Sequence, residues 1–199
     1  MTTLVYFHGF ASGPQGPTPK TELLRELGHQ VVLLATDGDY RPAGYRGVWA
    51  RLGLDPAGPL VLMGTSLGGF WARKLGHELG KPWIALNPAM QPSQSLLRYL
   101  GTNTRFDTGG SFDWSMADCE GYGAEEDFTP RADLPGLLIL AADDEVLDYR
   151  VARAAAGAAR VVVLSRGQHQ LHNTADYGVA VATFLAAVAD WPCRVRTPH

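Results

Sequence analysis

A short run, Gly64-Thr65-Ser66-Leu67-Gly68, constrains the fold of this chain more than any other part of its sequence. An apolar run at residues 60–63 precedes it, and the pattern of residues 67–79 is typical of a helix. A sharp turn between a strand and a helix leaves no room for side chains two residues to either side of its centre, so glycine is needed at both places. The sequence therefore predicts a strand, a strained turn and a helix in direct succession, with the Ser66 hydroxyl raised at the turn.

Apolar runs of strand length recur along the chain. They are continuous rather than alternating, which is typical of strands buried on both faces of a parallel sheet. The runs lie at residues 4–7, 31–34, 60–63, 83–86, 137–141 and 161–164. Between them, helices are expected at residues 19–27, 67–79, 149–159 and 175–189. This alternation predicts an α/β fold, a mostly parallel, doubly wound sheet of about six strands in one domain over residues 1–199.

One long stretch, about residues 88–133, interrupts the alternation. It contains a short amphipathic segment at residues 93–100 and then a glycine-rich, acidic sequence, with no clear strand. Its scattered aromatic residues are Phe106, Phe112, Trp114, Tyr122 and Phe128. Since scattered aromatics can bury area, we interpret the stretch as a cap with an apolar pocket, in which Phe10, Phe106 and Trp114 contact the ligand. The alternative is a packed surface excursion with no ligand role.

Composition excludes several classes of protein. A net charge of −3 provides no basic field for nucleic acid or anionic lipid. No run approaches the length of a membrane span, and the N-terminus lacks a basic leader, so we expect a cytoplasmic protein. Cys119 and Cys193 are too few for a disulfide scaffold or a zinc site, and we expect two reduced thiols. The oligomeric state is left open.

A serine hydroxyl is a poor nucleophile until a base takes its proton. For Ser66 we expect that base to be a histidine, oriented by a carboxylate. Where a nucleophilic serine stands on such a turn between a strand and a helix, the order along the chain is serine, acid, histidine, each after a strand. His169 follows the run at residues 161–164 through Gly167, so we favour it over His172 as the general base. The other histidines are not expected to be catalytic. His8 shapes the loop after the first strand, His29 and His77 lie near helix ends and are expected to be solvated or to cap the helix, and His199 is terminal.

The acid is expected directly after the run at residues 137–141. Asp143, Asp144, Glu145 and Asp148 all follow it. We favour Asp144, which lies in an Asp-x-Val-Leu arrangement familiar from the acid loop of α/β-hydrolases. Asp143 is expected to cap the turn and Asp148 to cap the helix that begins near Tyr149.

Attack of a serine on an ester carbonyl produces an oxyanion, which two backbone N–H groups must stabilise. One is expected from Leu67, the residue after the serine, and the other from Phe10, in the loop His8-Gly9-Phe10 after the first strand. This chemistry requires no metal and no organic cofactor. The expected partner is a small-molecule acyl ester or thioester.

Several segments together resemble a known family. They are Tyr6-Phe7-His8-Gly9-Phe10, Gly64-Thr65-Ser66-Leu67-Gly68-Gly69, Asn87-Pro88-Ala89, Tyr99-Leu100-Gly101 and Asp144-Glu145-Val146-Leu147-Asp148-Tyr149-Arg150. The sequence resembles the YqiA/YcfP-type esterases, small bacterial members of the α/β-hydrolase superfamily, from about residue 4 to residue 169. The resemblance implies a cytoplasmic esterase or thioesterase, with acyl-CoA among the candidate substrates and Ser66, Asp144 and His169 as the triad.

The chain departs from this family at two places. Gln170-Leu171-His172 stands where an aromatic residue commonly follows the histidine, and Asp143 stands where a small residue often precedes the acid. A second carboxylate there can change the pKa of the acid or compete for the histidine, so roles for Asp143 and His172 remain open. Two other functions also remain open: a catalytically idle scaffold or binding protein, and an enzyme that uses the same triad for acyl transfer or for amide or carbon–carbon cleavage.

Overall fold

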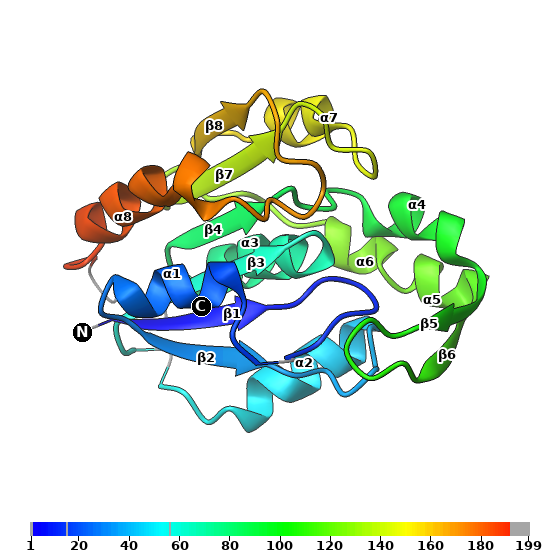
Figure 1. Cartoon of the computed structure of the whole chain (residues 1–199). Helices are drawn as coiled ribbons and strands as arrows, with labels where there is room; N and C mark the ends of the chain where they lie inside the picture. The colour runs from blue at the N-terminus through cyan, green and yellow to red at the C-terminus, as the bar shows by residue number, and fades with distance from the viewer. Residues whose placement is uncertain (1, 15, 56, 192–199) are drawn as a thin grey trace.

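The computed structural model describes residues 2–14, 16–55 and 57–191 (Figure 1). A six-stranded sheet in the order β2-β1-β3-β4-β7-β8 forms its centre, and every neighbouring pair is parallel. Its strands are β1 (Thr3–Phe7), β2 (Gln30–Leu34), β3 (Leu60–Thr65), β4 (Trp83–Leu86), β7 (Gly136–Ala141) and β8 (Arg160–Leu164). Each predicted apolar run lies within one of these strands, which confirms the predicted α/β sheet.

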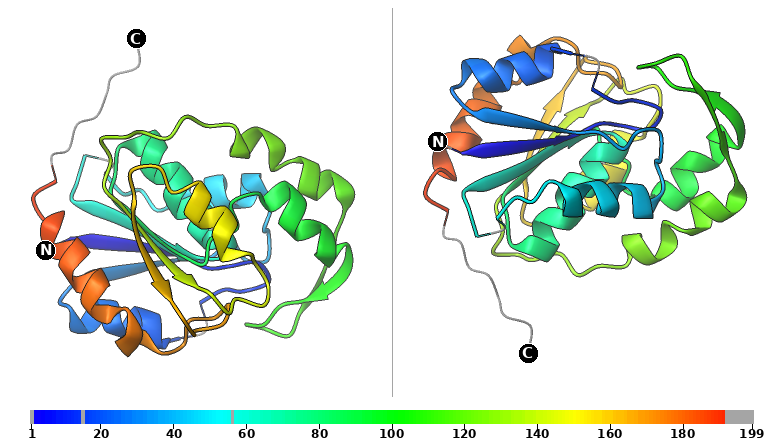
Figure 2. Two further views of the ribbon diagram at one scale, coloured as in Figure 1. Left: turned by 90° about the horizontal axis from the view of Figure 1, so that it is seen from above. Right: turned by 90° about the horizontal axis from the view of Figure 1, so that it is seen from below.

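Helices cover both faces of the sheet (Figure 2). The helices are α1 (Pro19–Glu26), α2 (Pro42–Arg51), α3 (Leu67–Leu79), α4 (Pro92–Ser95), α5 (Met116–Glu120), α6 (Gly123–Glu126), α7 (Tyr149–Ala154) and α8 (Gly178–Ala187), with 3₁₀ turns η1 (Leu96–Tyr99) and η2 (Thr174–Asp176). Buried side chains of α1 and α8 pack on one face, and those of α2, α3 and α7 pack on the other. Alternate strand residues serve the two layers, since Val5 and Phe7 face α3 whereas Leu4 and Tyr6 face α8.

Strand register brings the carboxyl ends of the central strands to one edge of the sheet. Phe7 pairs with Gly64, Thr65 with Leu86, and Leu86 with Ile139. The residues that follow these strands therefore meet at that edge, which is where open parallel sheets bind ligands.

Helices departed from prediction in three places. The sequence analysis missed α2, because Gly44 and Gly47 interrupt its pattern and only Tyr45 and Val48 are buried. Helix α7 ends at Ala154, earlier than the alanine-rich sequence predicts. Helix α8 begins at Gly178, because the preceding residues form the 3₁₀ turn η2.

The first part of the connection between β4 and β7, which includes α4, α5 and α6, lies beyond the carboxyl ends of the strands (Figure 1). The expectation that it holds no strand is wrong, since β5 (Gly101–Thr104) and β6 (Ser111–Trp114) pair as an antiparallel hairpin. These strands are four residues long and largely exposed, so no apolar run marks them in the sequence. Tyr122 anchors the connection, because its hydroxyl donates to the carbonyl of Tyr40 at 2.5 Å and accepts from Trp71 Nε1 at 3.3 Å.

Cys119 is a buried free thiol, whereas Cys193 and His199 lie outside the described residues. Within the described ranges, no helix combines the length and the apolar character needed to cross a membrane.

Candidate active site

Ser66 occupies the strained turn that the sequence predicts. It is the residue before α3 and has φ 56° and ψ −121°, in the region that favours glycine. Its N–H donates to the carbonyl of Leu86 at 2.9 Å. A Cβ atom on Gly64 would overlap the carbonyl group of Gly68, and one on Gly68 would overlap the carbonyl oxygen of Phe7. Both glycines are therefore required by close backbone packing, as predicted.

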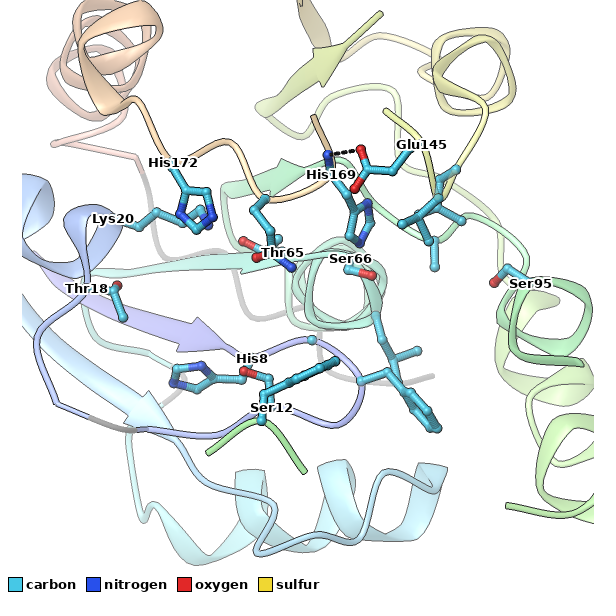
Figure 3. Close-up of a pocket in the computed structure, with 18 of the residues that line it drawn as sticks. His8, Ser12, Thr18, Lys20, Thr65, Ser66, Ser95, Glu145, His169 and His172 are labelled. Atoms are coloured by element: carbon cyan, nitrogen blue, oxygen red, sulfur yellow. Dashed lines mark hydrogen bonds between the residues drawn. The ribbon is translucent and has the colours of Figure 1, made fainter. Parts of the chain in front are cut away.

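A cavity of about 500 Å³ opens beside Ser66 (Figure 3). His169 lines it, as do both residues expected to donate to an oxyanion, Phe10 and Leu67. Its apolar wall includes Ala89, Leu96, Tyr99, Val146 and Leu147. The structure thus places an apolar surface and the candidate reacting groups in one cavity.

The three expected substrate contacts have different positions. Phe10 lines the cavity and packs against Tyr99, with 4.9 Å between ring centroids. Phe106 also lines the cavity but is 77% exposed. Trp114 is buried behind Phe10, with 4.9 Å between ring centroids, and is not among the residues that line the cavity. The structure therefore gives Trp114 a supporting position rather than contact with the cavity.

The structure brings His169 and Asp144 together. Nδ1 of His169 lies 2.9 Å from Oδ2 of Asp144 and 3.0 Å from Oδ1. Burial alone would raise the pKa of Asp144, but hydrogen bonds from His169 and from the N–H groups of Val146 and Leu147 outweigh it and hold that pKa below its usual value. Because an ionised carboxylate only accepts, Nδ1 carries the proton and Nε2 of the neutral ring is left with a lone pair.

The carboxylates on either side of Asp144 also bind the histidine loop. Oδ1 of Asp143 accepts from the N–H of Gln168 at 2.9 Å, and Oε2 of Glu145 accepts from the N–H of His169 at 3.0 Å (dashed line in Figure 3). The expectation that Asp143 caps its own turn is therefore wrong. Asp148 caps α7 as expected, since its side chain accepts from the N–H of Arg150 at 2.9 Å.

Asn87, which directly follows β4, holds the same loop, a role that the sequence analysis missed. Its Nδ2 donates to the carbonyls of Gln168 at 2.9 Å and His169 at 3.1 Å, and its Oδ1 accepts from the N–H of Ala141 at 2.8 Å. Asn87 is buried and has a positive φ of 40°. Its position directly after a buried strand, beside the Ser66 strand, is the signal that could have identified it.

The other histidines differ in their surroundings. His8 is 7% exposed, and burial lowers its pKa to about 4. Its backbone carbonyl accepts from the Tyr45 hydroxyl at 2.9 Å, a contact that does not depend on the imidazole. His77 is buried rather than solvated, and its Nδ1 accepts from the N–H of Arg131 at 3.0 Å. His172 is exposed and lines the same cavity as Ser66.

No group of three or more histidine, cysteine, aspartate or glutamate side chains with metal-binding geometry occurs in the part of the chain that the structure describes.

Solved structures share this architecture at low sequence identity. Est1E from Butyrivibrio proteoclasticus is 20% identical, with a TM-score of 0.70, covering 94% of this chain and 87% of that chain. Mouse alpha/beta hydrolase domain-containing protein 10 is 16% identical, with a TM-score of 0.65 and coverage of 94% and 89%. The esterase Pf2001 from Pyrococcus furiosus is 13% identical, with a TM-score of 0.64 and coverage of 94% and 83%. The fold is that of the α/β-hydrolases.

The sequence itself matches a family model over residues 49–186, that of the uncharacterised protein family UPF0227. The chain belongs to this family, which is the YqiA/YcfP family that the sequence resembles. The matched region contains Ser66, Asn87, Asp144 and His169, and it begins after Phe10.

Proposed function

We propose that this protein is a serine hydrolase that cleaves carboxylic esters through an acyl-enzyme. One observation carries the proposal: Ser66, raised on a strained turn, lines the same cavity as His169, whose Nδ1 is bound by Asp144. A scaffold or binding protein has no need of a serine in strained backbone beside an oriented imidazole. The family and the fold favour the same conclusion.

In the proposed acylation, Ser66 Oγ attacks the ester carbonyl carbon while His169 Nε2 accepts the hydroxyl proton. Asp144 keeps the proton on Nδ1 and stabilises the imidazolium that forms. The N–H groups of Leu67 and Phe10 stabilise the oxyanion of the tetrahedral intermediate. When that intermediate collapses, the bond to the leaving group breaks, and His169 returns the proton to the departing oxygen or sulfur.

In the proposed deacylation, a water molecule attacks the acyl-enzyme and loses its proton to the same Nε2. Collapse of the second intermediate releases the carboxylic acid and returns the proton to Ser66 Oγ. The apolar wall formed by Leu96, Tyr99 and their neighbours accommodates the acyl group. Esters and thioesters, acyl-CoA included, are the proposed substrate class, and the stretch at residues 88–133 acts as the cap that bounds the cavity.

The first test is hydrolysis of 4-nitrophenyl esters of graded acyl length by the wild type and by Ser66→Ala. We expect a clear optimum along the series and a loss of about 10⁴-fold or more in kcat for the variant. Ser165→Ala is a matched control, because Ser165 is exposed after β8 and does not line the cavity. Butyryl-CoA and an alcohol acceptor, added separately, measure thioester hydrolysis and acyl transfer.

A fluorophosphonate probe tests the nucleophile without a substrate. We expect stoichiometric labelling of the wild type and of Ser165→Ala and none of Ser66→Ala. A wild type that is neither labelled nor active on any ester would overturn the proposal and favour a scaffold. Unchanged turnover in Ser66→Ala would assign the chemistry to another residue.

A further inference from the structure

The cavity beside Ser66 has a polar side that the proposed reaction does not use. Thr18, Lys20 and His172 line it. In Figure 3 these three side chains lie on one side of Ser66, and Ser95 lies on the other. The cavity therefore extends from an apolar wall to a group of polar side chains on the other side of the serine.

Lys20 is the unusual member of this group. Lys20 lies in the first turn of α1 and is only 8% exposed. Within the described ranges, the ammonium group has no hydrogen-bond or ion-pair partner. Burial lowers the pKa of Lys20 to about 8, and no neighbouring charge contributes to the shift, so the group is still mostly protonated at pH 7.

The fold gains nothing from a positive charge at this position. An unpaired buried ammonium is destabilising, because it has lost water without gaining a counter-charge. The N-terminus of α1 is the positive end of the helix dipole, so a cation in its first turn is unfavourable as well. An anion in the cavity would relieve both effects, since it would pair with the ammonium and lie at the positive end of the helix.

The carboxylates near the cavity are already engaged. Glu145 accepts from the N–H of His169 and lies across the cavity from Lys20 (Figure 3). Asp107, which acts electrostatically on His8, forms an ion pair with Arg105 at 2.5 Å. The unsatisfied charge on this side of the cavity is therefore positive.

We propose that Lys20, at the N-terminus of α1, forms an anion subsite of the cavity, and that the preferred substrates are esters that carry a carboxylate or another anionic group. This inference rests on the proposed ester hydrolysis and names its substrate class. The anionic group belongs either to the acyl part or to the leaving group, and both positions place the same chemistry against the ammonium.

Two pairs of esters distinguish these positions. Mono-4-nitrophenyl succinate against 4-nitrophenyl pentanoate puts the carboxylate in the acyl part, and 3-(butyryloxy)benzoate against 3-(butyryloxy)benzamide puts it in the leaving group. We expect wild type to prefer the anionic member of one pair. Lys20→Met should lower kcat/KM for that member about 10- to 100-fold, mainly through KM, and change the neutral member less than about 2-fold.

Control variants separate charge from packing. Arg25→Met removes an exposed cation from the last turn of the same helix and should leave both pairs unchanged. Lys20→Arg keeps the charge and should keep the preference. Lys20→Met should unfold at the same temperature as wild type or higher, because it removes an unpaired buried charge. If Lys20→Met does not fold, Lys20→Gln replaces it in the same comparison.

The outcomes separate this inference from the proposed function. Hydrolysis of all esters with the same anionic-to-neutral ratio in wild type and Lys20→Met would overturn the subsite and leave the esterase intact. If wild type hydrolyses no ester, calorimetric titration with succinate and 3-hydroxybenzoate tests the subsite directly. Binding to wild type and Arg25→Met that is lost in Lys20→Met would support it, and the absence of binding to wild type would overturn it.

Discussion

Ser66 and His169 face the same cavity, yet the molecule holds them in opposite ways. Ser66 is fixed by backbone packing, in which Gly64 and Gly68 allow the turn to approach β1 and α3 more closely than any side chain permits. His169 lies in a loop held by side chains, namely Asn87 from below and three consecutive carboxylates from one side. One atom added between closely packed backbone segments displaces the whole turn, whereas the hydrogen bonds that hold a loop can be removed one at a time. The turn is therefore expected to tolerate no side chain at Gly64 or Gly68, and the loop to lose function in steps.

The largest effect is expected at Gly68. In Gly68→Ala the new Cβ would overlap the carbonyl oxygen of Phe7, which belongs to the backbone of β1 and cannot rotate away. We expect a loss of about 3 kcal/mol or more in the free energy of unfolding, or no folded protein. Chemical denaturation measures it.

Gly47→Ala is the matched control for that substitution. Its nearest neighbour is the end of the flexible Arg51 side chain at 3.4 Å, and alanine favours a helix interior. We expect α2 to be stabilised by about 0.5–1 kcal/mol. A Gly68→Ala protein as stable as wild type would show that the turn is not fixed by packing.

The next effect is expected at Asn87, which donates to two carbonyls of the loop. Asn87→Ala removes two donated hydrogen bonds and one accepted one, and two of the three backbone partners are buried, so we expect a loss of about 2–3 kcal/mol in stability. Displacement of the imidazole should lower kcat about 100-fold with little change in KM, because a shift of about 1 Å has that effect on a reacting group.

Asn103→Ala provides the comparison for Asn87. Asn103 also donates to two carbonyls, those of Tyr99 and Gly101, but it lies in the β5–β6 hairpin. Its substitution should leave kcat within about 2-fold of wild type. If Asn87→Ala lowered stability and left both kcat and the rate of phosphonate labelling unchanged, its role would be structural rather than one of positioning.

Acid pH should weaken the serine side of the site before the histidine side. His8, which follows β1 beside the Ser66 turn, has its pKa lowered by burial to about 4, so between about pH 6.5 and 4 the unfolded chain binds a proton that the folded chain does not. Stability therefore falls as pH falls through this window, by about 2 kcal/mol from pH 7 to 5. His77, whose pKa is also lowered to about 4, adds a similar loss.

Urea denaturation of His8→Gln at pH 7 and pH 5 measures how much of the acid-induced loss of stability comes from His8. We expect the difference between the two pH values to shrink by about 2 kcal/mol relative to wild type. Asp144→Asn should leave the difference unchanged, because the lowered pKa of Asp144 confines its contribution to pH values below about 4. The opposite pattern would place the acid-sensitive group in the histidine loop.

The same contrast explains how much the sequence could predict. Apolar runs report burial within a few consecutive residues, so the six strands and α3 could be located, and the glycines that flank Ser66 identified the turn. The hydrogen bonds that hold the loop join residues far apart in the chain, since Asn87 and His169 are separated by 82 positions. No local pattern records such a pair, and the partly polar hairpin β5–β6 and the glycine-containing α2 were missed for want of an apolar signal.

The smallest effect is expected from the carboxylates on either side of Asp144. Asp143 and Glu145 are exposed, and each accepts one hydrogen bond from a backbone N–H that can donate to water in its place. We expect Asp143→Ala and Glu145→Ala each to lower kcat/KM less than about 5-fold, which corresponds to about 1 kcal/mol. Since both hold the same short loop, the double variant should lose more than the sum of the single losses, and a double-mutant cycle measures that excess. A Glu145→Ala loss as large as that of Asn87→Ala would mean that the exposed side of the loop, rather than the buried amide below it, sets the position of the imidazole.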